Sequence, residues 1–215
     1  MDHAIDLRWN QFINCFTFDR SRKVSCVHAT AFCAKHCYNR MTDTWKWVNE
    51  KDKRLEESWQ WFNGNNVARI LSCKRSRQTD RVRFMGRGEA FRDMSDVPHV
   101  LDICSGSPNR LFWIPTRAWR DNELRTAIEN RVLEVPNIRV QASTDPTTSI
   151  SEYSSLVASG WSSMFFGESI DIAEDRYGVK FHKCAKTHKH IKGHCAECVG
   201  GCFDASQVHV HLEEH

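Results

Sequence analysis

Short apolar runs alternate with amphipathic stretches along most of the chain, and this order limits the possible folds more than any other feature. After residue 80 the apolar runs have the length and composition of β-strands, and the stretches between them repeat at helical spacing. Such alternation predicts right-handed βαβ units and a parallel sheet. We therefore expect an α/β protein with a partial (βα)-barrel-like parallel sheet, helices outside it, and a C-terminal cysteine-rich segment.

The same patterns predict where the individual elements lie. Strands are predicted at 12–18, 81–85, 110–114, 137–143, 161–166 and 178–182, and helices at 44–62, 120–134 and 150–158, with further helical spacing at 67–71 and 97–104. Asp19-Arg20-Ser21 predicts a polar turn, and the alternating tail at 208–215 predicts an edge strand. We divide the chain into a barrel-like domain at 1–180, which carries the first cysteine loop, and a cysteine- and histidine-rich metal-binding tail at 181–215 packed on it.

The expected compartment decides how the ten cysteines are interpreted. The first ten residues carry charges where a secretory signal needs an apolar run, and no stretch approaches the roughly 20 apolar residues that span a bilayer. We expect a cytoplasmic protein with no membrane partner. In a reducing compartment, clustered cysteines indicate metal binding or catalysis instead of disulfides. The net charge of +3 is small, so a nucleic-acid partner is not indicated.

The first cysteine group, Cys26, Cys33 and Cys37, places three thiolates within twelve residues. Thiolates suit iron–sulfur clusters and zinc, whereas magnesium and calcium need oxygen ligands. Three local cysteines without a fourth fit a cubane cluster that leaves one iron open. Zinc would need a fourth protein ligand, which His28 or His36 could supply. We favour the cluster, with zinc and buried structural thiols as the alternatives.

The second cysteine group contains four thiolates, enough to complete a site without other ligands. Its members are Cys184, Cys195, Cys198 and Cys202, and the nearby histidines are His182, His188, His190 and His194. The compact C-x2-C-x3-C spacing suits a second iron–sulfur cluster, and the histidines suit structural zinc. A third alternative is that one of these cysteines completes the first cluster, with no second metal.

Several chemically capable residues follow predicted strands. In parallel architectures, loops beyond the carboxyl ends of the strands lie on one face of the sheet and carry the reactive groups. The first cysteine loop, the GRGE turn at 86–89, PTR at 115–117 and STD at 143–145 should therefore share one face. The plain alternative for the GRGE turn is a tight strand-to-helix connection, and for PTR and STD it is helix caps and turns.

The segment at 26–38, CVHATAFCAKHCY, resembles the cysteine signature of the bacteriophage gene-product-88 family and, more distantly, that of radical S-adenosylmethionine enzymes. The resemblance covers most of the chain in the order of its motifs. It implies that Cys26, Cys33 and Cys37 ligate a [4Fe–4S] cluster. It also implies that S-adenosylmethionine would be held through its amino group by Gly86, Gly88 and Glu89 and through its ribose by Ser143 and Asp145. This chain departs from the radical enzymes in a looser cysteine spacing and in Arg87, which separates the two glycines.

Three classes of function are consistent with these features. The first is an enzyme that cleaves S-adenosylmethionine reductively at an open-iron cluster, supplied by an electron donor. The second is a non-catalytic iron–sulfur protein that transfers electrons or senses redox state. The third is a zinc-stabilised interaction module. The sequence favours cluster binding over zinc through the number and grouping of its thiolates, and it assigns no residue a catalytic role.

Overall fold

The computed structural model describes residues 7–37, 46–73, 78–188, 191, 193–199, 201–203 and 208–213. Within these residues one eight-stranded sheet has the order β1-β2-β3-β4-β5-β6-β8-β7. The strands are β1 (Leu7–Asn10), β2 (Cys15–Asp19), β3 (Arg81–Arg87), β4 (Leu111–Thr116), β5 (Ile138–Thr144), β6 (Ser162–Phe166), β7 (Phe181–Lys183) and β8 (His209–Leu212). β1 pairs antiparallel with β2, and every other neighbouring pair is parallel.

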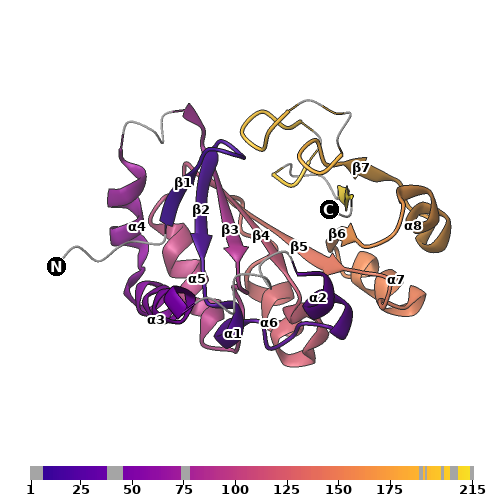
Figure 1. Ribbon diagram of the computed structural model, residues 1–215, viewed down its shortest axis with the longest axis horizontal. Helices are drawn as coiled ribbons and strands as arrows, with labels where there is room; N and C mark the ends of the chain where they lie inside the picture. The colour runs from indigo at the N-terminus through magenta and orange to yellow at the C-terminus, as the bar shows by residue number, and fades with distance from the viewer. Residues whose placement is uncertain are drawn as a thin grey trace.

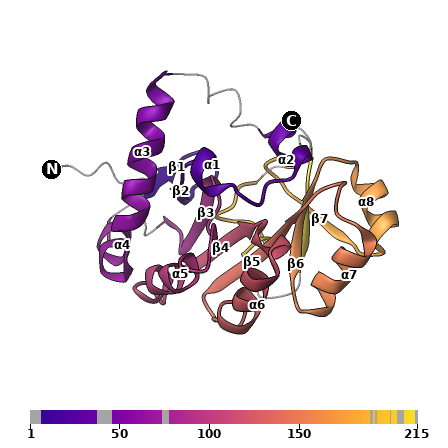
Figure 2. The ribbon, with the colours of Figure 1, turned by 90° about the horizontal axis from the view of Figure 1, so that it is seen from below.

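The sheet is open, because β1 and β7 lie at its two ends and do not pair with each other. Helices cover one side of its curve and leave the other side to the C-terminal segment (Figure 2). This arrangement confirms the predicted α/β class and its partial-barrel character. The helices are α1 (Arg22–Ser25), α2 (Ala31–His36), α3 (Lys46–Trp61), α4 (Gly64–Leu71), α5 (Asp96–Ser105), α6 (Asn122–Arg131), α7 (Ile150–Ala158) and α8 (Ile170–Tyr177), with a 3-10 helix η3 (Ala118–Arg120).

The main core lies between the helices and one face of the sheet. Alternate strand residues, among them Phe18, Phe84 and Phe112, are fully buried there against the helices. Because successive side chains of a strand point to opposite faces, Arg81, Arg83 and their neighbours across the sheet face the other way. We call this second face, opposite the helices, the inner face.

Local sequence explains where the helices begin and end. Asp121 caps α6 by accepting a hydrogen bond from the Leu124 amide, and Ser149 and Glu152 form a capping box at the start of α7. Polar side chains just before amphipathic stretches therefore set these boundaries. The predicted helices at 120–134 and 150–158 and the strands that precede them are confirmed, with boundaries shifted by a few residues.

Three predictions about the elements were wrong or incomplete. The tail strand β8 is not an edge strand, because it lies between β6 and β7 and pairs with both. The predicted strand at 12–18 begins only at Cys15, and the separate strand β1 precedes it. Asp19, Arg20 and Ser21 are each no more than 2 % exposed, so this polar stretch is buried, and the Arg20 guanidinium contacts the Asp96 carboxylate at 2.8 Å.

The two cysteine groups lie toward opposite ends of the central strands. α1 and α2, which carry the first group, follow the carboxyl end of β2, at the lower end of the strands in Figure 1. The segment between β7 and β8, which carries the second group, lies at their upper end. Arg81, the first residue of β3, hydrogen-bonds to this segment. The division of the chain at residue 180 stays a prediction, since β7 and β8 pair within the same sheet as the other strands.

Candidate functional site

The first cysteine group is positioned by two short helices at the carboxyl end of the sheet. Cys26 is the C-cap of α1, Cys33 lies within α2, and Cys37 is the C-cap of α2. The Thr30 hydroxyl caps α2 by accepting a hydrogen bond from the Cys33 amide at 2.9 Å. The cap therefore fixes the start of α2, the helix that carries Cys33.

The three thiols of this group lie close enough to influence one another. Burial, with a smaller contribution from the nearby Glu89, Cys33 and Cys37, raises the pKa of the Cys26 thiol to about 12. All three cysteines are partly exposed, and none of the ten cysteines, all within the described residues, forms a disulfide. A set of converging, partly accessible thiols is able to bind a soft metal centre or to be oxidised.

A buried hydrogen-bonded bridge attaches this cysteine loop to the strands. The Asp145 carboxylate, directly after β5, accepts hydrogen bonds at 2.7 Å from the Thr30 hydroxyl and from the Arg117 guanidinium. Both Asp145 and Arg117 are buried, and the positive charge of Arg117 opposes the rise that burial causes in the pKa of the Cys33 thiol. The bridge therefore connects the loop after β2 with the ends of β4 and β5, as expected for loops on one face of the sheet.

The Asp145 carboxylate has no evident capacity left for a ligand. Its second oxygen accepts hydrogen bonds from the amide and the hydroxyl of Thr147. Although burial alone would raise its pKa, the bonds from Thr147 and Thr30 and the charge of Arg117 hold the pKa of Asp145 below its ordinary value. The predicted ribose contact by Asp145 therefore finds no support, and of Ser143 the structure shows that its carbonyl accepts a hydrogen bond from the Trp119 indole.

Gly86 and Arg87 of the GRGE segment are the last residues of β3, and the connection that starts at Gly88 reaches α5 only at Asp96, so the predicted tight strand-to-helix turn is not formed. Gly88 has a φ of +89°, and a Cβ there would lie 2.6 Å from the Arg20 carbonyl oxygen. A Cβ on Gly86 would meet Thr17 and Asp19 at less than 3 Å. The two glycines therefore allow β3 to lie directly against the start of the cysteine loop.

Glu89 accepts hydrogen bonds on both carboxylate oxygens. Oε1 accepts from the amides of Ala90 and Phe91 and from the Thr116 hydroxyl, and Oε2 accepts from the Arg117 amide. Burial raises the pKa of the Glu89 carboxyl above its ordinary value, and these hydrogen bonds oppose that rise. The bonds tie the segment after β3 to the end of β4, and the contact of Glu89 to a cofactor's amino group stays a prediction.

The second cysteine group surrounds one small cavity of about 20 Å³. The cavity is lined by all four cysteines, together with His182, His194, Phe203 and others. Burial raises the pKa of the Cys195 thiol to about 11, and the nearby Cys184 and Cys198 add to the rise while Arg83 opposes it. The four thiols thus lie together, and the spacing pattern correctly grouped them.

The inner face of β3 supports the second group. The Arg81 guanidinium donates hydrogen bonds to the carbonyl oxygens of Cys195 at 2.6 Å and Cys198 at 2.7 Å. It also stacks over the Phe203 ring at 5.3 Å. The Arg83 guanidinium lies over Trp113, and its positive charge acts on Cys195 and on Cys202. Two arginines of one strand therefore face the four thiols.

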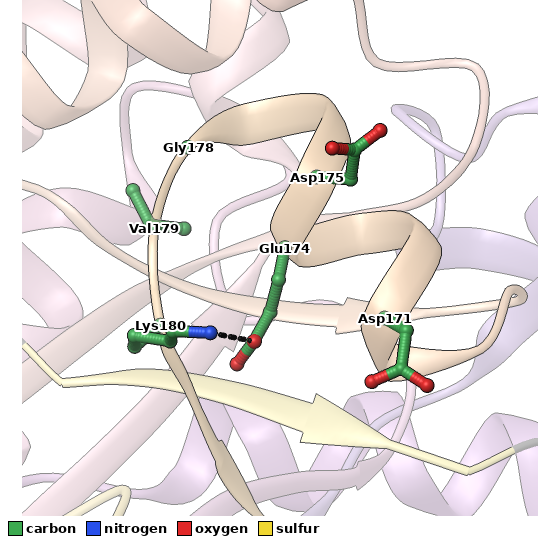
Figure 3. Close-up of a pocket in the computed structure, with 6 residues that line it drawn as sticks. All are labelled: Asp171, Glu174, Asp175, Gly178, Val179 and Lys180. Atoms are coloured by element: carbon green, nitrogen blue, oxygen red, sulfur yellow. Dashed lines mark hydrogen bonds and ion pairs between the residues drawn. The ribbon is translucent and has the colours of Figure 1, made fainter.

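Neither group is arranged as a finished single-metal site. Within the described part of the chain, no set of three or more histidine, cysteine, aspartate or glutamate side chains stands in a geometry that could hold a metal ion. A larger hollow, of about 450 Å³, lies at the turn between α8 and β7 and contains none of the cysteines. There Glu174 reaches Lys180, while Asp171 and Asp175 point in other directions (Figure 3). Glu174 also caps the Phe181 amide, so this hollow reflects the turn itself.

Thr30, Arg81 and Arg83 are the residues of these sites that sequence patterns did not single out. Arg117 was expected on this face as part of the PTR segment, because it directly follows a strand, as the cysteine loop follows β2. Arg81 and Arg83 were visible only as alternate residues of a strand. Their partners lie more than 100 positions away, which no local pattern reveals.

Comparison with known proteins supports the resemblance at the level of the family. A family model described as gene product 88 matches residues 4–204. No curated protein and no solved structure matches the chain. Among the described residues, every helix is too short or too polar to cross a bilayer. Since the family model spans nearly the whole sequence, the chain belongs to the gene product 88 family.

Proposed function

We propose that this protein is an iron–sulfur protein in which Cys26, Cys33 and Cys37 ligate a [4Fe–4S] cluster. The observation that carries the proposal is the convergence of three partly exposed thiols at the carboxyl end of a parallel sheet. Thiolates are the preferred ligands of such clusters. The irons of a cubane are spread over a larger core than a single ion, so its ligands stand farther apart than those of one metal ion.

The charges around the thiols support a positively charged inorganic centre. Burial and the neighbouring Glu89 disfavour a bare thiolate at Cys26, whose pKa is raised to about 12. Three mutually repelling thiolates are therefore costly without a metal, and binding of iron would compensate their charge. Bound there, the cluster would supply one-electron transfer.

The Asp145 carboxylate near the loop is not placed to add a fourth ligand. It is buried and accepts two hydrogen bonds on each oxygen, which coordination of a metal would break. With the three thiolates as its protein ligands, the cluster would keep one iron open to an exogenous molecule.

The chain's own residues orient the loop. Arg117 pairs with Asp145 at 2.7 Å and its positive charge acts on the Cys33 thiol, while Thr30 caps the helix that carries Cys33. Charges and hydrogen bonds close to a ligating sulfur are among the features that set a cluster's reduction potential. Arg117 is therefore a positioning residue for the proposed centre.

The finer proposal, reductive cleavage of S-adenosylmethionine, rests on the resemblance of the cysteine loop. This chemistry would need Glu89 to bind the amino group of the cofactor and Asp145 to bind its ribose. Both carboxylates already accept hydrogen bonds from the protein on both oxygens, so we derive no step through that cofactor. The same observation favours the second candidate, a non-catalytic protein that transfers electrons or responds to redox state.

Metal analysis of protein purified without oxygen tests the cluster. We expect about four irons and about four sulfides from the first group, with a brown colour. Replacing Cys26, Cys33 and Cys37 together by alanine should abolish that iron, whereas Cys73→Ser, at an exposed cysteine outside both groups, should leave it unchanged. Iron and colour that persist in the triple variant would refute the proposal.

A second assay separates the two candidates. The iron-loaded protein is incubated with S-adenosylmethionine and a strong reductant, and 5′-deoxyadenosine is measured. Formation of this product supports the enzyme. Its absence, together with a cluster spectrum that does not respond to S-adenosylmethionine, supports the electron-transfer protein.

A further inference from the structure

The second cysteine group differs from the first in that its four thiols line one cavity. These four cysteines are partly exposed, as are the three of the first group. The Cys198 sulfur also lies 3.6 Å from the His182 imidazole. Four soft donors around one small space are the composition of a closed tetrahedral metal site.

We propose that Cys184, Cys195, Cys198 and Cys202 bind a single Zn²⁺ ion, and that this ion ties the C-terminal segment to the inner face of the sheet. The proposal does not depend on a cluster at the first group. It needs the four thiols to rotate inward, because the described side chains are not yet in ligating positions.

The side chains around the cavity favour one zinc ion over a cluster. Four cysteine thiolates complete a tetrahedral structural zinc site, with sulfur ligands at about 2.3 Å. His182 and His194 line the same cavity, and imidazole nitrogens are also zinc ligands.

The charge around the cavity is complementary to a zinc–thiolate centre. One Zn²⁺ with four thiolates carries a net charge of −2. The two arginines of β3, Arg81 and Arg83, bring two positive charges to the same place. Arg81 acts through the carbonyl oxygens of Cys195 and Cys198, at the compact end of the motif, and so holds the knuckle in place for the metal.

The four ligands come from a segment that spans the sheet. Cys184 follows the edge strand β7, and its amide donates to the His211 carbonyl on β8 at 3.0 Å. Phe203, just after Cys202, packs on Trp113 of β4 with ring centroids 5.9 Å apart. A metal that joins Cys184 to Cys202 therefore connects the open edge of the sheet to its centre.

The surroundings also separate this site from the first. The charges that act on Cys195 and Cys202 come from the other cysteines of the second group and from Arg83 and Lys186. Those that act on Cys26 and Cys33 come from Glu89, Arg117, Asp145 and their own group. This separation argues against a C-terminal cysteine as the fourth ligand of the first cluster.

Zinc and iron are measured on the same anaerobically purified full-length protein by mass spectrometry. The expected result is about one zinc ion per chain. The double variant Cys195→Ser/Cys198→Ser should lower bound zinc at least tenfold and leave the iron of the first group unchanged, and Cys73→Ser should change neither metal. Wild-type protein without zinc, or a double variant that loses iron and sulfide instead of zinc, would overturn the proposal.

A measurement on the unmutated chain covers the case in which the double variant does not fold. Protein produced with Co²⁺ in place of zinc should show the visible bands and the sulfur charge-transfer absorption of a tetrahedral thiolate site. If those bands are absent although cobalt is bound, the metal is not held by these thiols and the proposal fails. If the wild-type protein contains zinc but no iron, the cluster proposal is refuted and the zinc proposal stands. The two proposals therefore fail separately.

Discussion

The two cysteine groups use the same side chain in opposite settings. The first lies in a loop beyond the carboxyl ends of the strands, partly exposed, with the buried carboxylates Glu89 and Asp145 beside it. The second is also partly exposed and lies on the inner face of the sheet around one cavity, with Arg81 and Arg83 beside it. The charges that act most on Cys195 and Cys202 come from the other cysteines of the group, Arg83 and Lys186.

This difference teaches how a fold can assign different tasks to one ligand type. Structural metal sites are closed, whereas sites that do chemistry keep a position open. The first group has three thiols with two buried carboxylates beside them, and the second has four thiols with two arginines beside them. This contrast is the one we expect if the first group binds a cluster with an open iron and the second binds a structural zinc ion.

The largest effect is expected from a substitution that breaks the hydrogen-bonded bridge of Asp145 with Thr30 and Arg117. Asp145→Ala leaves the buried Arg117 guanidinium without its partner, which should cost about 3–5 kcal/mol of unfolding free energy. Urea unfolding measures the loss, and metal analysis should show less iron with zinc unchanged. Asp171→Ala, at an exposed position on α8, is the control and should stay within about 0.5 kcal/mol of the wild type. An equal loss of zinc would show that the two groups are coupled.

The corresponding change at the second group should have a smaller effect. Arg81→Gln removes two charge-assisted hydrogen bonds to the carbonyls of Cys195 and Cys198, worth about 1.5–3 kcal/mol. Zinc should pass to a chelator faster than in the wild type, while iron stays bound. A colorimetric dye measures the rate of zinc transfer. The exposed Arg131→Gln on α6 serves as the charge-matched control. An unchanged rate of zinc exchange would show that Arg81 does not stabilise the site.

A still smaller effect is expected at the cap of α2. Thr30→Val loses the hydroxyl that caps the Cys33 amide and bonds to Asp145, at a cost of about 0.5–2 kcal/mol. Thr30→Ser keeps the hydroxyl and should restore most of the stability in thermal unfolding. If serine and valine behave alike, the hydrogen bonds of Thr30 contribute nothing measurable.

The smallest effect concerns pH and the strand that anchors the second group. Burial lowers the pKa of His209, whose ring contacts the Tyr153 and Ser163 hydroxyls at 2.9 Å. The unfolded chain therefore binds a proton at higher pH than the folded one. The stabilisation is present above about pH 6.5 and is lost as the pH falls toward the folded-state pKa, with a slope of at most about 1.4 kcal/mol per pH unit for this group.

Unfolding by urea at several pH values between about 7.5 and about 5.5 measures that slope. His209→Asn keeps a hydrogen-bonding atom near the hydroxyls and removes the titration, so its stability should depend less on pH than that of the wild type. The burial of His211 on the same strand lowers its pKa too and leaves a residual slope in both proteins. An identical slope in the variant and the wild type would show that His209 does not contribute.

Much of the architecture was predictable because it depends on local periodicity. The strand–helix alternation after residue 80 predicted the parallel sheet, and β3, β4, β5 and β6 lie within a few residues of the predicted strands. Cysteine spacing likewise predicted two separate groups, because residues a few positions apart in a loop cannot lie far apart in space. These features are properties of short segments.

Other features depended on partners that are distant along the chain. Asp145 reaches Arg117 over 28 positions and Thr30 over 115, and Arg81 reaches Cys195 over 114. The tail strand alternates as an edge strand does, yet it is inserted between β6 and β7. Period-2 alternation specifies a strand and its two faces, but it carries no information on how many neighbours the strand has.

The sequence alone determined the fold class and the division of the clustered cysteines into two groups, since both follow from residue type and spacing. Only the tertiary structure decided that Glu89 and Asp145 already accept hydrogen bonds on both oxygens, and that carboxylates lie beside one cysteine group and arginines beside the other. The reason is physical: the availability of a polar or thiol group depends on burial and on its hydrogen-bond partners, and both are set by elements that meet only after the sheet has formed.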